Sequence, residues 1–231
     1  PEPAATVADM PDLALPLVVA AIVVVVLVLV LRRRGGSPLT AQFLAVADRR
    51  GWQRIPPAEA TDVVADFDTY LQGDGSVDLA VGGEVDGGRG LVAAVGVRDR
   101  VARGRPWYVA IVTRPDLAIP TIVMEPRSVR TVRVVAGEDE VVIDDARISR
   151  GWRITSPDPD AARVLDAPEV RTRLSDALHR PMPFIVGPRL RPGGVAVHLA
   201  GPEDQPTDAD DIDRLARLAL DVADALAAAP V

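Results

Sequence analysis

The residues of this chain best suited to nucleophilic and acid–base chemistry are one serine and the only two histidines. Ser175 and His179 are four residues apart, so a helix would place them on one face, as a nucleophile and its general base could be placed. The sequence around Ser175 has no glycine that could form the sharp turn and oxyanion loop of a hydrolase. We therefore interpret His179 as a residue near a helix C-terminus and His198 as part of an apolar strand, and predict no catalytic residue.

One glycine-rich segment, residues 82–90, could let a backbone approach a phosphate group. A nucleotide-binding loop joins a strand to a helix, whereas strand-like sequence lies on both sides of this segment and two acids, Glu84 and Asp86, lie within it. All 26 basic residues are arginine, and without lysine the P-loop and Schiff-base chemistry are excluded. We predict a mobile hairpin connection and no nucleotide cofactor.

Two groups of carboxylates resemble metal or acid–base sites. The first group lacks the central glycine and distal glutamate of a calcium loop, and its first three members suit the first turn of a helix: Asp208, Asp210, Asp211 and Asp213. The second group, Asp144 and Asp145, has no neighbouring histidine and suits an acidic turn between strands. The chain has no cysteine, which excludes thiolate chemistry and cysteine-based metal sites. We predict no metal site.

A basic strip is the candidate partner surface. It comprises four arginines followed by two aromatic residues: Arg98, Arg100, Arg103, Arg105, Trp107 and Tyr108. The strip could contact a protein partner or anionic lipid, or it could be a solvated hairpin offset by neighbouring acids. The net charge of −7 and the aromatic content of 3% disfavour nucleic acid as a partner.

An apolar segment near the N-terminus suggests membrane insertion. Residues 13–31 carry no charged or polar side chain, which is enough for a transmembrane helix through a lipid bilayer. Acids precede the segment, and the topology-determining residues Arg32, Arg33 and Arg34 follow it. The positive-inside rule then places the N-terminus outside and the following domain in the cytoplasm, as a single-pass protein of the cell membrane.

The remaining sequence predicts one α+β domain. Helices are expected at 40–50 and 58–71, and again at 160–178 with a break at Pro168. Between and after them lie β-branched runs typical of an antiparallel, meander-like sheet: 77–81, 91–98, 107–113, 119–124, 129–135, 141–143, 152–155, 184–190 and 195–199. A C-terminal amphipathic helix follows, capped by Thr207, with Ile212, Leu215, Ala219, Val222 and Leu226 on its apolar face.

These elements divide the chain into four parts. They are an outer tail at 1–12, a transmembrane helix at 13–31, a basic stop-transfer segment and linker at 32–38, and a soluble α+β domain at 39–231. The fold class is therefore α+β, with one N-terminal transmembrane helix followed by an antiparallel sheet packed with helices.

Several segments resemble uncharacterised single-span membrane proteins of high-GC Gram-positive (actinobacterial) bacteria. The resemblance rests on the runs 151–156, 158–165 and 168–171, on Gly51-Trp52, and on the last hairpin and helix. The group more often has phenylalanine at the position of Trp152, and its arginine-rich strand pattern is absent around residues 80–104. No activity is established for the group, so the resemblance implies architecture alone.

Our leading hypothesis is a non-enzymatic binding or scaffolding module at the cytoplasmic face of the membrane, acting through membrane-associated protein partners. The absence of cysteine and lysine removes common nucleophiles and bases and favours this hypothesis. The alternative is an enzyme or ligand-sensing domain whose pocket is formed by residues scattered along the sequence.

Overall fold

A computed structural model describes residues 37–67, 76–96, 107–128, 139–181, 186–199 and 208–228 of this chain. The chain divides into two compact units, Pro1–Ala41 and Gln42–Val231, and most of the described residues belong to the second. The outer tail, the transmembrane helix expected at 13–31, and Arg32, Arg33 and Arg34 lie outside the described residues.

The predicted fold class needs a correction. No helix in the described part of the chain is both long enough and apolar enough to cross a bilayer. The longest is α6 (Ala209–Ala227), with 19 residues, but charged side chains occupy one of its faces, so it packs on a sheet instead. The described fold is α+β with an antiparallel sheet and no transmembrane helix.

In the described residues the sheet has nine strands, and every neighbouring pair is antiparallel. Its spatial order is β1-β2-β3-β4-β9-β8-β5-β7-β6. The strands are β1 (Gln53–Ile55), β2 (Ser76–Val85), β3 (Gly88–Gly96), β4 (Trp107–Thr113), β5 (Ile122–Pro126), β6 (Asp139–Glu140), β7 (Trp152–Ser156), β8 (Val186–Arg191) and β9 (Gly194–Leu199). The late hairpin β8–β9 therefore lies between β4 and β5, so the sheet is not the simple meander we expected.

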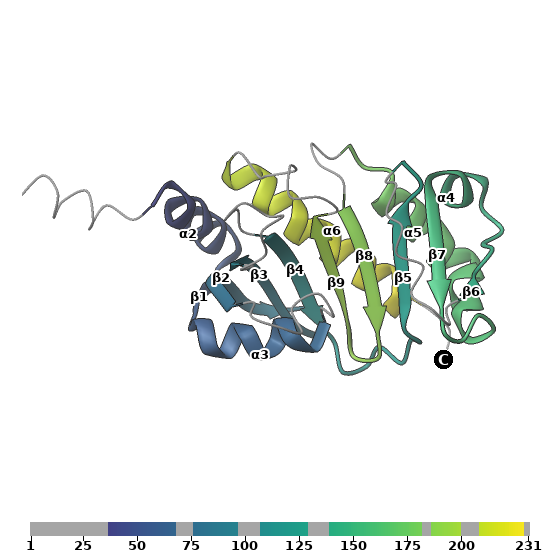
Figure 1. Cartoon of the computed structure of the whole chain (residues 1–231), viewed down its shortest axis with the longest axis horizontal. Coiled ribbons are helices and arrows are strands. Elements are labelled where there is room, and N and C mark those ends of the chain that lie inside the picture. The colour runs from purple at the N-terminus through teal and green to yellow at the C-terminus, as the bar shows by residue number, and fades with distance from the viewer. Residues whose placement is uncertain are drawn as a thin grey trace, which may run out of the picture. The chain divides into compact units, whose positions relative to one another are not determined.

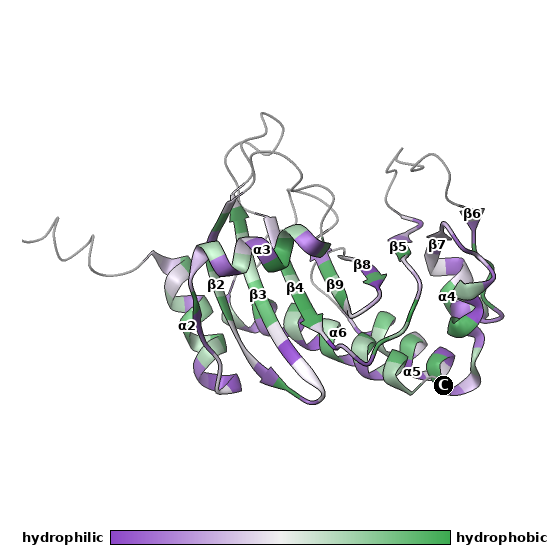
Figure 2. Ribbon diagram, turned by 90° about the horizontal axis from the view of Figure 1, so that it is seen from below, coloured by the Kyte–Doolittle hydropathy of each residue, from purple (hydrophilic) through white to green (hydrophobic). Residues whose placement is uncertain are grey.

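Helices cover the two faces of this sheet unequally. On one face α3 (Pro57–Phe67) packs across β2 to β4, and on the other face α6 packs across β3, β4 and β9 (Figures 1 and 2). The helical layer that α6 forms is extended by α5 (Pro168–Leu178), which packs against α6. In the described residues no helix covers β8, β5 and β7 on the face where α3 lies (Figure 2).

The remaining helices are short or lie at the domain edge. They are α2 (Pro38–Arg50), α4 (Ala146–Gly151) and the 3-10 helix η2 (Ala161–Asp166). In α2, Phe43, Val46 and Ala47 are buried, whereas Leu44 is 45% exposed and lies off the packed face. Gly51 follows α2 with a φ of 65°, the left-handed conformation that glycine favours at a helix end.

Several predicted elements are confirmed and others are not. The strand at 107–113 and the break at Pro168, which is the first residue of α5, are as expected. The last helix is capped by Asp208, whose side chain accepts from the Asp211 amide, and not by Thr207, which is outside the described residues. Residues 141–143 form no strand, residues 129–135 are outside the described part, and α4 and β1 were not predicted.

Candidate functional site

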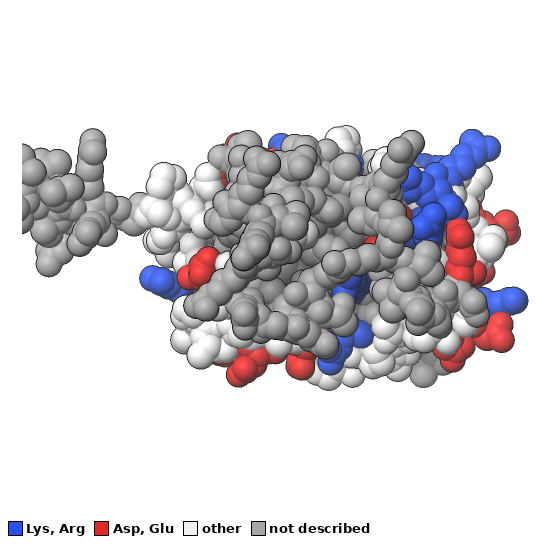
Figure 3. Space-filling view, in the orientation of Figure 1, with Lys and Arg blue, Asp and Glu red and all other residues white. Residues whose placement is uncertain are grey.

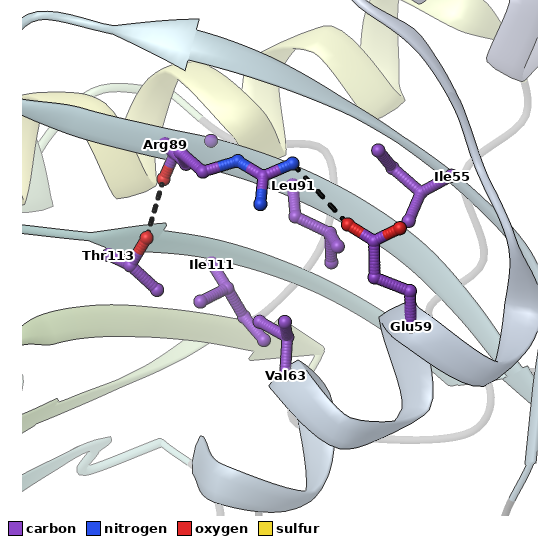
Figure 4. A pocket seen from close by; sticks show the side chains of 8 residues that line it. Ile55, Glu59, Val63, Arg89, Leu91, Ile111 and Thr113 are labelled. Atoms are coloured by element: carbon purple, nitrogen blue, oxygen red, sulfur yellow. Dashed lines mark hydrogen bonds and ion pairs between the residues drawn. The ribbon is translucent and has the colours of Figure 1, made fainter.

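A cavity lies between α3 and the sheet, on the face that α3 only partly covers. Its volume is about 40 Å³, and its mouth is partly open to the outside. Side chains of α3 and of the sheet point toward one another around it (Figure 4). The lining residues are Ile55, Glu59, Val63, Arg89, Gly90, Leu91, Ile111 and Thr113.

The apolar part of the cavity follows from the sheet register. Leu91 of β3 is paired with Ile111 of β4, and side chains of paired residues project to the same face. Both residues are buried in the core cluster beneath α3, whereas Val63 of α3 is only partly buried at its edge. Packing in the core therefore holds the floor of the cavity in place, whereas the Val63 side chain at its mouth is less constrained.

The polar rim is an ion pair between α3 and β3. The Arg89 guanidinium lies 3.4 Å from a carboxylate oxygen of Glu59, and the two side chains are 55% and 47% exposed. The Thr113 hydroxyl donates to the Arg89 carbonyl oxygen at 3.3 Å. An exposed pair at this separation contributes only about 0–1 kcal/mol, so a ligand group could replace either partner at little cost.

This arrangement suits the binding of a ligand. An apolar floor beside one cation and one carboxylate can hold an apolar group that carries a charge. Its lining includes no histidine, cysteine or lysine, and the one hydroxyl, that of Thr113, donates to backbone. Sequence reasoning missed this cavity because its residues come from β1, α3, β3 and β4, which only the tertiary structure brings together.

The glycine-rich segment 82–90 forms a tight hairpin that packs against Trp52. Gly83 and Gly90 face each other across β2 and β3, and a Cβ atom at either position would lie 2.6 or 2.5 Å from the Trp52 indole. The turn itself is Asp86-Gly87, with Gly87 at a φ of 71°. The hairpin prediction is confirmed, and two of the glycines make room for a side chain instead of a phosphate.

Ser175 and His179 do not form a nucleophile–base pair. The Nδ1 atom of His179 lies 2.7 Å from the Ser175 carbonyl oxygen, and the buried Ser175 hydroxyl has no hydrogen-bond partner. His198 lies on β9 opposite Gly187, where burial, helped by Arg189, lowers its pKa to about 3. His198 is therefore neutral near neutral pH and is a poor proton acceptor there.

Each of the two acidic clusters supplies one helix cap. Asp208 accepts from the Asp211 amide at 3.0 Å, and Asp145 accepts from the amides of Arg147 and Ile148. Asp213 instead contacts Arg50 of α2 at 2.6 Å. Within the described ranges no group of three or more potential ligands could hold a metal ion.

Only two residues of the basic strip are described. Arg98, Arg100, Arg103 and Arg105 lie outside the described residues. Tyr108 is 5% exposed and stacks on Phe43 with ring centroids 6.3 Å apart, and burial raises its pKa. Trp107 packs partly buried against the core beneath α3. Tyr108 therefore belongs to the core in this structure.

Polar side chains occupy the part of the sheet that α3 leaves uncovered. The register places them on the face that carries Ile111 and Ala196, and all are partly buried: Glu125, Arg153, Thr155, Arg189, Arg191 and His198. The sequence did not single out this surface. Basic and acidic side chains are interspersed where this face is visible (Figure 3).

Comparisons with known proteins identify a fold and no family. No family model matches the sequence, and no curated protein matches it significantly. Among solved structures, the crystal structure of the mycobacterial trehalose monomycolate transport factor A, TtfA, is similar with a TM-score of 0.59. The likeness is one of fold. It spans 85% of this chain and 99% of TtfA at 14% sequence identity, and its mycobacterial source agrees with the actinobacterial resemblance of the sequence.

Proposed function

We propose that this chain is a non-enzymatic accessory factor that works with membrane-associated protein partners in a transport process. The observation that carries the proposal is the fold likeness to TtfA over 99% of the TtfA chain, because TtfA is a trehalose monomycolate transport factor. A shared fold does not by itself transfer function, so the proposal also relies on the character of the cavity.

The cavity supports a binding role in two ways. Its apolar floor and polar rim resemble a small recognition site, and its lining lacks the residue types that supply most nucleophiles and bases. Ser175 is buried on α5, which packs against α6 on the other face of the sheet, and His198 is not among the lining residues. A module of this kind would act by holding proteins together.

Affinity purification tests the proposal directly. The full chain should be tagged in its native cells, cross-linked, extracted in mild detergent and analysed by quantitative mass spectrometry against a tag-only control. We expect enrichment of at least one integral membrane protein with a role in transport. Enrichment of soluble proteins alone would contradict the proposal.

A substrate screen on the same purified protein tests the alternative that the chain is an enzyme. We expect no turnover that depends on Ser175, His179 or His198. Turnover that disappears in Ser175→Ala or His198→Gln, while the variant keeps its circular dichroism spectrum, would replace the binding proposal with a catalytic one.

A further inference from the structure

The cavity beneath α3 lies in a row of residues that carries two arginines. Across neighbouring strands, Arg89 is paired with Thr113, Thr113 with Gly194, and Gly194 with Arg191. Three strand spacings separate Arg89 from Arg191, a distance of roughly 14 Å. Both arginines therefore belong to the sheet face on which the cavity opens.

Neither arginine is strongly held by a carboxylate in the described part of the chain. Arg89 has the weak, half-exposed pair with Glu59 at 3.4 Å. Arg191 contacts an aromatic ring instead, with its guanidinium carbon 4.6 Å from the centroid of Phe67. A Cβ at Gly194 would lie 2.7 Å from the Phe67 ring, so glycine is required between the two arginines for the ring to lie there. The row presents two cations that an external carboxylate could reach.

The size of the cavity indicates which apolar group it can take. An engineered apolar cavity of about 150 Å³ binds benzene, which gives a scale for comparison. The space here is about 40 Å³, which suits the tip of one branched side chain and not an acyl chain. The wider mouth, bordered by the partly buried Val63, would admit the rest of that side chain from outside.

We propose that this site, formed by the cavity with Arg89 and Arg191, binds an acidic segment of a protein partner that inserts one apolar side chain. The inference rests on the proposed function, because it names how the partner is recognised. The apolar side chain fills the cavity and excludes water, which is how anchor residues dominate many interfaces. Carboxylates on either side of the anchor pair with the two arginines, and Glu59 swings away from Arg89.

Peptide selection tests the chemistry of the occupant. A random-peptide phage library should be panned on the full chain after depletion on the Val63→Phe variant, whose larger ring fills the mouth of the cavity. We expect the selected peptides to share an aliphatic residue next to aspartate or glutamate. Selection of peptides without acidic residues would overturn the proposal. Saturable binding of decanoate, an acyl chain with one carboxylate, would also overturn it if the selected peptides did not displace the decanoate.

Matched variants test the residues, with dissociation constants measured by fluorescence anisotropy on a selected peptide. We expect Arg89→Gln and Arg191→Gln each to weaken binding by about fivefold, as for a rim charge worth about 1 kcal/mol. Val63→Phe should weaken it by about tenfold or more, because it blocks the anchor. Arg163→Gln is the control, since Arg163 is 74% exposed in a surface pair with Asp160 on η2. Equal affinities for all variants with native circular dichroism spectra would overturn the proposal.

One further variant separates this proposal from a loss of folding. Glu59→Gln removes the carboxylate that competes for Arg89 and leaves α3 and the core unchanged, so it should bind the peptide as tightly as the wild type or more tightly. Weaker binding would show that Glu59 itself is the recognition group. If Val63→Phe and Arg89→Gln each still co-purified with a membrane partner from cells, this result would contradict the site. The proposed function would not be affected.

Discussion

The Trp52 indole packs so closely on β2 and β3 that each strand has glycine at the point of contact. It lies over the cross-strand pair Gly83 and Gly90, and the guanidinium carbon of Arg50 lies 5.3 Å from its ring centroid. A large ring can lie this close to a sheet only where no Cβ projects from it. At the residue scale, the glycines of this hairpin are therefore packing partners of one side chain.

Adding a methyl group at this pair should destabilise the domain. We expect Gly90→Ala to lower the free energy of unfolding by about 1–3 kcal/mol, because the new Cβ overlaps the ring and the ring has to shift. Urea denaturation followed by circular dichroism measures the change. Gly151→Ala is the matched control, because the nearest atom to its Cβ would be 3.8 Å away. Equal midpoints for the two variants would show that Trp52 moves aside without cost.

Two ion pairs join the end of α2 to the start of α6, and they differ in exposure. The side chains of Arg50 and Asp213 are 16% and 13% exposed, whereas those of Arg49 and Asp210 are 51% and 60% exposed. The Asp213 side chain is covered by Arg50 of α2. A charge at Asp213 is therefore partly desolvated and depends on its partner.

Neutralising the two aspartates should have different effects. We expect Asp213→Asn to cost about 1–3 kcal/mol of unfolding free energy, because Arg50 is left partly buried with a weaker acceptor. Asp210→Asn should have little measurable effect, because water surrounds that pair. Thermal denaturation of both variants in low salt compares them directly. A larger loss in Asp210→Asn would contradict this ranking of the pairs.

At the scale of elements, α6 is the helix that holds the sheet together. It contacts β3, β4 and β9 on one side and α5 on another. The apolar positions predicted from its sequence are all buried: Ile212, Leu215, Ala219, Val222 and Leu226. At its C-terminal end, Asp224 pairs with Arg114 at 3.0 Å, and Arg114 also pairs with Asp116 near the β2–β3 turn. One helix thereby links strands that are distant in sequence.

Truncating the buried face of α6 should be costly. Leu215 has no exposed surface, so Leu215→Ala should lower the unfolding free energy by about 2–5 kcal/mol. Asp210→Ala on the same helix is the control, because the Asp210 side chain is 60% exposed and its partner Arg49 is also half-exposed, so a surface change of this kind costs little. Chemical denaturation provides both values. The docked position of α6 would be contradicted if the two variants were equally stable.

At the scale of the domain, α2 is part of the core of the unit Gln42–Val231. Phe43 and Val46 have no exposed surface, and Phe43 stacks on Tyr108 of β4. The two ion pairs described above attach the last turn of this helix to α6. The domain therefore depends on a helix at its N-terminal edge as much as on the sheet.

Removing α2 should be detected as a loss of stability of the whole domain. A protein covering residues 37–231 should melt in a single transition, because its core elements form one compact unit. A protein covering residues 51–231 loses two fully buried apolar side chains and both arginines, and should melt at a lower temperature or fail to fold. Equal melting temperatures would show that α2 is an appendage.

The sequence by itself determined several of the local elements and the apolar face of the last helix. Periodicity identified the last helix and its buried face, because amphipathic spacing depends only on neighbours along the chain. The helix expected at 40–50 ends where α2 ends, and the break expected at Pro168 is the start of α5, because both reflect a local backbone requirement. These signals require no knowledge of distant contacts.

Only the tertiary structure decided the strand order and the cavity. The insertion of β8–β9 between β4 and β5 depends on long-range pairing that leaves no local pattern in either hairpin. The exposure of Leu44, the burial of Tyr108 and the pairing of Asp213 with Arg50 each depend on what packs against the element. The cavity joins side chains from β1, α3, β3 and β4, and the row from Arg89 to Arg191 exists only because β9 lies beside β4. A site assembled across strands in this way is set by sheet register, which the sequence of any single segment does not contain.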